Sequence, residues 1–123
     1  MTNVDRSLVL HLSDGQTKIP GPSGEHAVSL LRHGTLNAIL SHGRFAPRGP
    51  RESSARDKDE VYVVVHGRGV FVHGGARDAF DAGDLLFVAA GTEHRFEDFS
   101  DDLVVWVVFY GVHGGEIPVR GAP

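Results

Sequence analysis

The sequence predicts a single all-β domain, built as a sandwich or closed barrel of short strands. Three observations support this fold class. The chain has 123 residues, which is within the size range of one compact domain. It contains 16 glycines, many of which separate short apolar runs. No stretch sustains the period of an amphipathic helix, and short strands between glycine turns are typical of sandwiches and barrels.

The first 34 residues are weakly patterned. The apolar run at 7–12 predicts a strand, and 27–34 predicts either a short strand or one turn of helix. Between them, 19–26 is expected to be a loop, because Pro20 and Pro22 exclude a helix there.

The segment 35–45 alternates in polarity and predicts a half-buried strand. One face of this strand carries Leu36, Ala38, Leu40 and His42. A long polar connection over 46–59 follows it.

The second half of the chain predicts six strands separated by turns. The motif HGRG is interpreted as a hairpin turn, and the strand ending at 111 is apolar enough to be buried on both faces. The tail after it is expected to be loose. The six strands are expected within residues 60–66, 70–75, 76–80, 85–91, 94–100 and 101–111.

Composition excludes several classes of protein. The formal charge of −4 argues against nucleic acid or an anionic membrane as a partner. With no cysteine, the chain has no disulfides, no thiolate chemistry and no cysteine-bound zinc. Its apolar runs are too short for a membrane span or a signal peptide. We therefore expect a soluble, cytoplasmic protein.

Two blocks carry the most specific pattern. In the first, Glu60 begins a strand and Gly67 follows after six residues. In the second, Gly83 opens a strand, Gly91 makes a turn and His94 comes soon after it. This arrangement resembles the cupin superfamily, in particular its small single-domain members of the conserved-barrel type.

The resemblance covers roughly residues 35–111 and implies a jelly-roll β-sandwich barrel, often a homodimer. It divides the chain into an N-terminal strand or loop extension (1–34), a barrel core (35–111) and a C-terminal tail (112–123).

The resemblance also implies a metal site for Fe, Mn, Zn or Ni, built from two histidines and a glutamate in the first block and a histidine in the second. Glu60 and His94 match that pattern. The two remaining histidine positions hold either Ser54 and Arg56 or Ser53 and Ala55, depending on the spacing. Elsewhere in the second block, Ala89 stands where the family has proline and Asp98 where it has asparagine.

The metal site is therefore expected to be incomplete, with no tightly bound cofactor. Glu60 and His94 alone would hold a metal weakly, because catalytic sites normally keep three protein ligands. His42 is the candidate for a third ligand.

A second hypothesis replaces the metal by a fixed cation. The guanidinium of Arg56 would pair with Glu60, and His94 would join the same cluster by a hydrogen bond. Tyr62 and Phe96 are candidates for the mouth of the pocket. The alternatives are a solvated Glu60 at a strand end, a satisfied turn histidine at His94 and an outward Arg56. Other residues are expected in structural positions: Trp106, Phe109 and Tyr110 in the core or a dimer interface, and His11, His26, His33 and His113 on the surface.

Four functions stay open at this point. The first is a small-molecule binding barrel, whose ligand would be anionic if Arg56 and His94 hold it. The second is a metal-dependent dioxygenase, isomerase or cyclase. The third is a metal-free enzyme with Glu60 and His94 as base and acid. The fourth is a non-catalytic dimeric scaffold.

Overall fold

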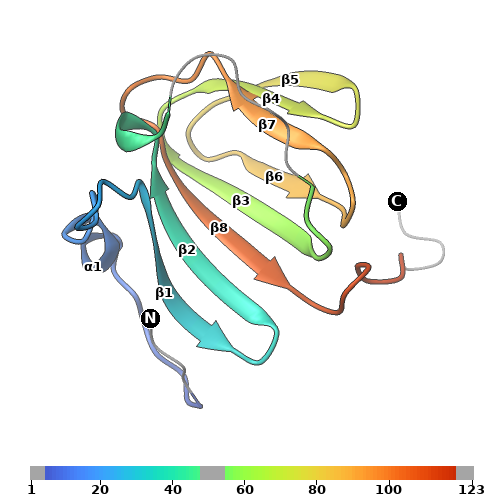
Figure 1. Cartoon of the computed structure of the whole chain (residues 1–123), viewed down its shortest axis with the longest axis horizontal. Coiled ribbons are helices and arrows are strands. Elements are labelled where there is room, and N and C mark those ends of the chain that lie inside the picture. The colour runs from blue at the N-terminus through green and yellow to red at the C-terminus, as the bar shows by residue number, and fades with distance from the viewer. Residues whose placement is uncertain (1–4, 48–54, 119–123) are drawn as a thin grey trace.

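Two antiparallel β-sheets packed face to face form the protein (Figure 1). A computed structural model describes residues 5–47 and 55–118. One sheet has five strands in the order β1-β2-β8-β3-β6, and the other has three in the order β5-β4-β7. The predicted all-β sandwich is confirmed. The strands are β1 (Ala27–His33), β2 (Leu36–His42), β3 (Asp59–His66), β4 (Gly69–His73), β5 (Ala76–Phe80), β6 (Leu85–Val88), β7 (His94–Glu97) and β8 (Val104–Tyr110).

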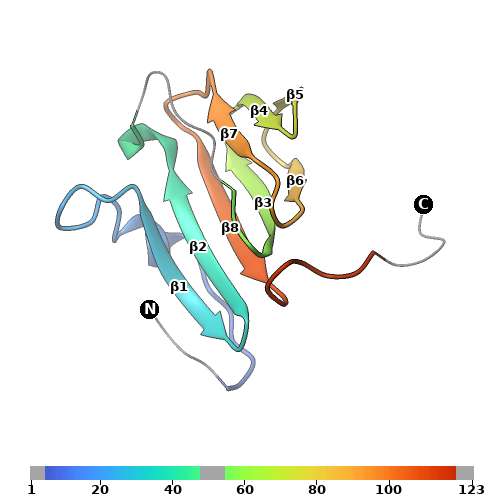
Figure 2. The same ribbon diagram turned by 45° about the vertical axis from the view of Figure 1, so that its right-hand side comes forward.

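The three-stranded sheet covers only part of the larger one. Figure 2 shows β4, β5 and β7 above the side formed by β3, β6 and β8, while β1 and β2 extend beyond them. The main core lies between the sheets, and its buried members include Tyr62, Val64, Phe71, Phe80 and Val107. The larger sheet therefore has an inner face toward the core and an outer face away from it.

Strand β8 runs through the middle of the larger sheet, between β2 and β3. Val104, Val105 and Val107 are all buried although they point to opposite faces. The prediction of a strand buried on both sides is confirmed for this half of β8. The outer face has its own smaller core, formed by Ile19, Leu30, Leu40 and Val104.

The N-terminal segment supplies the cover for this outer core, and here one prediction was wrong. Residues 7–11 form no strand, and α1 (Leu12–Gln16) follows them on the outer side of β1 (Figure 1). The Asp14 carboxylate accepts a hydrogen bond from the His11 backbone N–H at 2.8 Å. Such a local side-chain bond favours a helix start over a strand. Leu10 and Leu12 then pack against the outer core.

The motif HGRG is a corner between the sheets, so the predicted hairpin was also wrong. Strand β3 pairs with β6 and β8, whereas β4 pairs with β5 and β7. Gly67 has φ = 91°, and a Cβ there would lie 2.7 Å from the Leu103 Cα. This close approach lets the chain turn sharply from one sheet to the other. The turn over Gly74 and Gly75 is a hairpin, because it joins the antiparallel neighbours β4 and β5.

The tail has no helix or strand over 111–118, but it is held in place. The backbone N–H of Glu116 donates to the buried Asp59 carboxylate at 2.8 Å, and Gly114 N–H donates to the Asp57 carbonyl at 2.6 Å. The expected loose tail is therefore tied to the start of β3 in its described part.

Within the described ranges, no helix is long and apolar enough to cross a membrane. The domain boundaries, the homodimer and the cytoplasmic location stay predictions.

Candidate functional site

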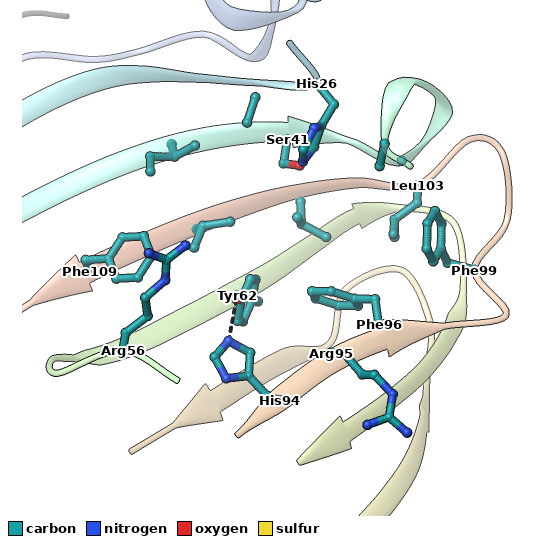
Figure 3. Close-up of a pocket in the computed structure, with 16 residues that line it drawn as sticks. His26, Ser41, Arg56, Tyr62, His94, Arg95, Phe96, Phe99, Leu103 and Phe109 are labelled. Carbon is teal, nitrogen blue, oxygen red and sulfur yellow. Dashed lines mark hydrogen bonds between the residues drawn. The ribbon is translucent and has the colours of Figure 1, made fainter. Parts of the chain in front are cut away.

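A cavity of about 320 Å³ lies between the two sheets. Its walls are mostly apolar, and four of its side chains are aromatic: Tyr62, Phe96, Phe99 and Phe109. Figure 3 shows Tyr62 and His94 on one side of this space and His26 with Ser41 on the other. A cavity of this kind, apolar with a few polar groups, is typical of small-molecule sites.

Three buried polar side chains form a cluster at the cavity wall, which we call the Glu60–Tyr62–His94 cluster. His94 Nε2 lies 2.5 Å from Glu60 Oε1. The Tyr62 hydroxyl donates to the same oxygen at 3.0 Å and lies 3.1 Å from His94 Nε2. The exposed fractions are 1% for Glu60, 3% for His94 and 8% for Tyr62. Tyr62 and His94 line the cavity, whereas Glu60 does not.

The strand pattern explains why these side chains meet. Glu60 and Tyr62 are two residues apart on β3, so both point to the inner face of the larger sheet. His94 begins β7 in the opposite sheet. Before it, Gly91 takes φ = 82°, which makes the tight turn that aims β7 across the sandwich. The cluster therefore connects the two sheets.

The position of the proton on His94 follows from the contact of its Nδ1 atom. Nδ1 lies 2.9 Å from the Thr92 carbonyl oxygen, which can only accept, so Nδ1 carries a proton. The 2.5 Å contact between Nε2 and Glu60 Oε1 also needs a proton between the two atoms. His94 and Glu60 therefore share a proton, as an imidazolium with a carboxylate or as the corresponding neutral pair.

The surroundings shift two pKa values in this cluster. Burial of the His94 imidazole opposes its charge, but the hydrogen bonds to Glu60 and the Thr92 carbonyl and the charge of Glu60 outweigh burial. The net result is that the pKa of His94 is raised. Burial, followed by the charge of Glu60 and the hydrogen bond to it, raises the pKa of Tyr62 far above its usual range. Tyr62 is thus a permanent hydrogen-bond donor.

Arg56 lies at one end of the cavity, without the expected pairing to Glu60. Within the described residues it forms no ion pair with that carboxylate, and its guanidinium carbon lies 5.9 Å from the centre of the Phe109 ring. Its charge still acts on Tyr62 and His94, because it works against the rise in the pKa of each. A hydrogen bond of 2.6 Å from Gly91 N–H to the Arg56 carbonyl fixes its backbone beside the β7 turn.

The cluster does not fit the metal that the cupin pattern implies. Ligands about 2.1 Å from one ion, at tetrahedral or octahedral angles, lie about 3.0 to 3.4 Å apart. His94 Nε2 and Glu60 Oε1 are closer than this, and they hold a proton where the ion would be.

The remaining groups do not complete such a site either. Glu60 Oε2 is buried and has no hydrogen-bond partner among the described atoms, but His94 is turned to the other oxygen. In residues 5–47 and 55–118, no three histidine or acidic side chains are placed to hold an ion. Ser53 and Ser54, which stand at histidine positions of the pattern, lie outside the described residues.

The structure does not bring His42 to the cluster. Its neighbour Ser41 lines the cavity, and the alternation along β2 sends His42 to the outer face. There it is the cross-strand partner of Val104, which is also the partner of His66 on β3. Phe96 does line the cavity, as expected.

Sequence reasoning missed several cavity residues, among them His26, which was expected on the surface, and Ser41, which was not singled out. Phe109 packs against the main core, in agreement with the expectation of a core position, and it also lines the cavity. No sequence signal marked Ser41, because it shares the more polar face of β2 with Asn37 and Ile39. The more apolar face of β2 is its outer face, which the N-terminal segment covers.

Comparisons with known proteins agree with the fold. The structure of BH2720 from Bacillus halodurans matches with a TM-score of 0.65 and 17% identity, over 89% of this chain and 86% of that one. A Cupin 2 conserved barrel domain protein from Salinispora arenicola CNS-205 matches with a TM-score of 0.54 and 20% identity, over 69% and 74%. At these identities, the likeness concerns the fold alone.

A relative by sequence is uncharacterized protein SCO3923 from Streptomyces coelicolor. It is 42% identical over 52 residues, which cover 42% of this chain and half of that relative. The model of the family described as "Cupin domain" matches residues 42–110. That span contains β3 to β8, the cluster and the corner at Gly67. The chain therefore belongs to the cupin domain family.

Proposed function

We propose that this protein is a metal-independent cupin that binds a small organic molecule in the interior of its barrel. The observation that carries the proposal is the contact between His94 Nε2 and Glu60 Oε1, capped by Tyr62, at the wall of an apolar cavity. A shared proton satisfies the two groups that would otherwise bind a metal. The cluster then serves as the polar wall of a binding pocket.

The size of the cavity supports a ligand of modest size. A volume of about 320 Å³ corresponds to roughly ten water molecules, at about 30 Å³ each in the liquid. An apolar ligand would gain affinity by covering the valine, leucine and phenylalanine walls.

Glu60 leaves one oxygen of the cluster without a hydrogen-bond partner among the described atoms. This oxygen, Oε2, is buried. A buried acceptor of this kind costs about 1 to 3 kcal/mol when nothing donates to it. Because Glu60 does not line the cavity, a water molecule beside Oε2, and not the cavity ligand, would remove that cost.

Metal analysis tests the metal-independent half of the proposal. The protein, made without a histidine tag, is stripped with a chelator, incubated with Fe, Mn, Zn or Ni and analysed by plasma mass spectrometry. We expect no stoichiometric metal in the wild type. One equivalent of metal that is lost in both Glu60→Ala and His94→Ala would overturn the proposal and favour a metal-dependent enzyme.

Ligand-observed NMR tests the binding half. A set of small aromatic and aliphatic amides, alcohols and acids is screened against the wild type and an Ile39→Trp variant, in which the indole fills the cavity. We expect hits that the variant loses while its far-UV circular dichroism stays unchanged. Hits that bind both proteins equally would place the binding outside the barrel.

A further inference from the structure

We infer that the ligand is a small aromatic carboxylate, with its carboxylate held by Arg56 and its ring among the phenylalanines of the cavity. This inference rests on the proposed function and names the class of ligand that the cavity selects.

The charge of the cavity wall is the first argument. Among the described residues that line it, the ionisable side chains are His26, Arg56, Tyr62, His94 and Arg95, and none is an aspartate or glutamate. The nearest buried carboxylate, Glu60, is already matched by His94 and Tyr62. The wall therefore carries excess positive charge, which favours an anion in the cavity.

Arg56 is the cation available for that anion. Arg95 also lines the cavity, but its guanidinium points away from the cavity centre in Figure 3 and donates to Glu97 at 2.5 Å. The Arg56 guanidinium, by contrast, lies over Phe109 at the end of the cavity. A guanidinium within cation–π distance of a ring keeps its N–H groups for a further partner, and they match a carboxylate in two hydrogen bonds.

The aromatic walls are the second argument. Phe96 and Tyr62 have ring centres 5.0 Å apart at 83°, an edge-to-face contact, and Phe99 and Phe109 line the same space. Aromatic rings prefer such edge-to-face or offset neighbours, so a ligand ring gains more from this wall than an aliphatic chain of equal area. A ligand with one carboxylate and one aromatic ring also fits a cavity of this volume.

The test compares an acid with its neutral amide. Isothermal titration calorimetry measures phenylacetate and phenylacetamide, with benzoate and cinnamate as a shorter and a longer acid. The proteins are the wild type, Arg56→Gln and the matched control Arg95→Gln. We expect the wild type to bind the best acid at least tenfold more tightly than phenylacetamide. Arg56→Gln should abolish this preference, because a hydrogen-bonded ion pair out of water is worth about tenfold or more, and Arg95→Gln should keep it.

The outcomes separate this inference from the proposed function. Equal binding of acid and amide, or a preference that survives Arg56→Gln, would overturn the inference and leave a binding barrel. Loss of the preference in Arg95→Gln alone would move the anion site to that residue and also overturn it. If neither the acids nor the amide bind, and no compound of the NMR set does either, the proposed function itself fails.

Discussion

Two of the histidine–carboxylate contacts among the described residues have similar lengths and lie in opposite environments. His94 and Glu60 are buried between the sheets, with side chains that are 4% and 1% exposed. His113 and Asp57 form the second contact at the start of the tail, with side chains that are 78% and 69% exposed. The partners are chemically alike, so the difference between them isolates the effect of burial.

The comparison shows that the surroundings, and not the distance, decide what such a pair does. An exposed pair exchanges its contact for water at little cost, and many such pairs contribute nothing measurable. A buried pair cannot do so, because either partner alone would be a charge or polar group without water. The stability of the fold is therefore expected to depend on the Glu60–Tyr62–His94 cluster and not on the His113–Asp57 contact.

The largest expected effect comes from removing the buried carboxylate. Glu60→Ala removes the buried carboxylate that shares a proton with His94 Nε2, so we expect the free energy of unfolding to fall by about 3 to 5 kcal/mol. Urea denaturation measures this free energy of unfolding. Asp57→Ala is the matched control, for which we expect no measurable change. A triple variant, Glu60→Leu with Tyr62→Phe and His94→Leu, should regain much of the loss, because no polar side chain of the cluster is left unpaired. Equal losses for Glu60→Ala and Asp57→Ala would contradict the comparison.

A smaller effect is expected for the hydroxyl that caps the buried pair. Tyr62→Phe removes one hydrogen bond to a charged oxygen and keeps the ring that packs on Phe96. We expect a loss of about 1.5 to 3 kcal/mol in the same denaturation experiment. Tyr110→Phe, at the end of β8 and outside the cluster, should stay within the error. A stabilising Tyr62→Phe change would mean that the hydroxyl is not satisfied in the cluster.

The pH dependence of stability provides a still finer comparison. The pKa of His94 is raised in the folded protein, so its protonated form favours the fold. This contribution is fully present below the unfolded pKa of about 6.5 and is lost as the pH rises through the folded value. Burial and the charge of His66 lower the pKa of His42, which gives the opposite sign.

A comparison of the wild type with a His94 variant isolates the contribution of His94 to the pH dependence from that of His42. We expect the difference in unfolding free energy between the wild type and His94→Asn to shrink as the pH rises above about 6.5. Denaturation curves at a series of pH values measure this difference. A difference that is constant with pH would mean that His94 does not gain its proton on folding.

The buried pair could be predicted from the sequence, and the exposed pair could not. Glu60 and His94 stand at fixed distances from Gly67 and Gly91, whose positive φ values set the corner and the turn around them. This spacing identifies the two blocks in the sequence, and their meeting in one cluster is what the resemblance to cupins implies. His113 meets Asp57 across 56 residues, through a tail with no periodic pattern.

The same reasoning explains what was missed inside the cavity. The alternation of side chains along a strand shows which residues share a face. It shows which face points to the main core only when the segment that covers the outer face is known. The outer face of β2 is covered by Leu10, Leu12 and Ile19, from a segment whose helix begins through a bond between His11 and Asp14. Without that cover, Leu40 and His42 looked like inner residues and Ser41 like an outer one.

The smallest effect is expected at the exposed pair, and it should appear in a pKa without appearing in stability. The hydrogen bond from His113 is the main reason that the pKa of Asp57 lies below its usual value. His113→Ala should therefore raise the pKa of Asp57, as measured by a carboxyl-carbon NMR titration, and leave the denaturation midpoint unchanged. Asp57 keeps its other tie to the tail, because Gly114 N–H donates to the backbone carbonyl, which the substitution does not remove. A clear loss of stability in His113→Ala would show that the tail depends on the side-chain pair, and the two contacts would then differ in degree and not in kind.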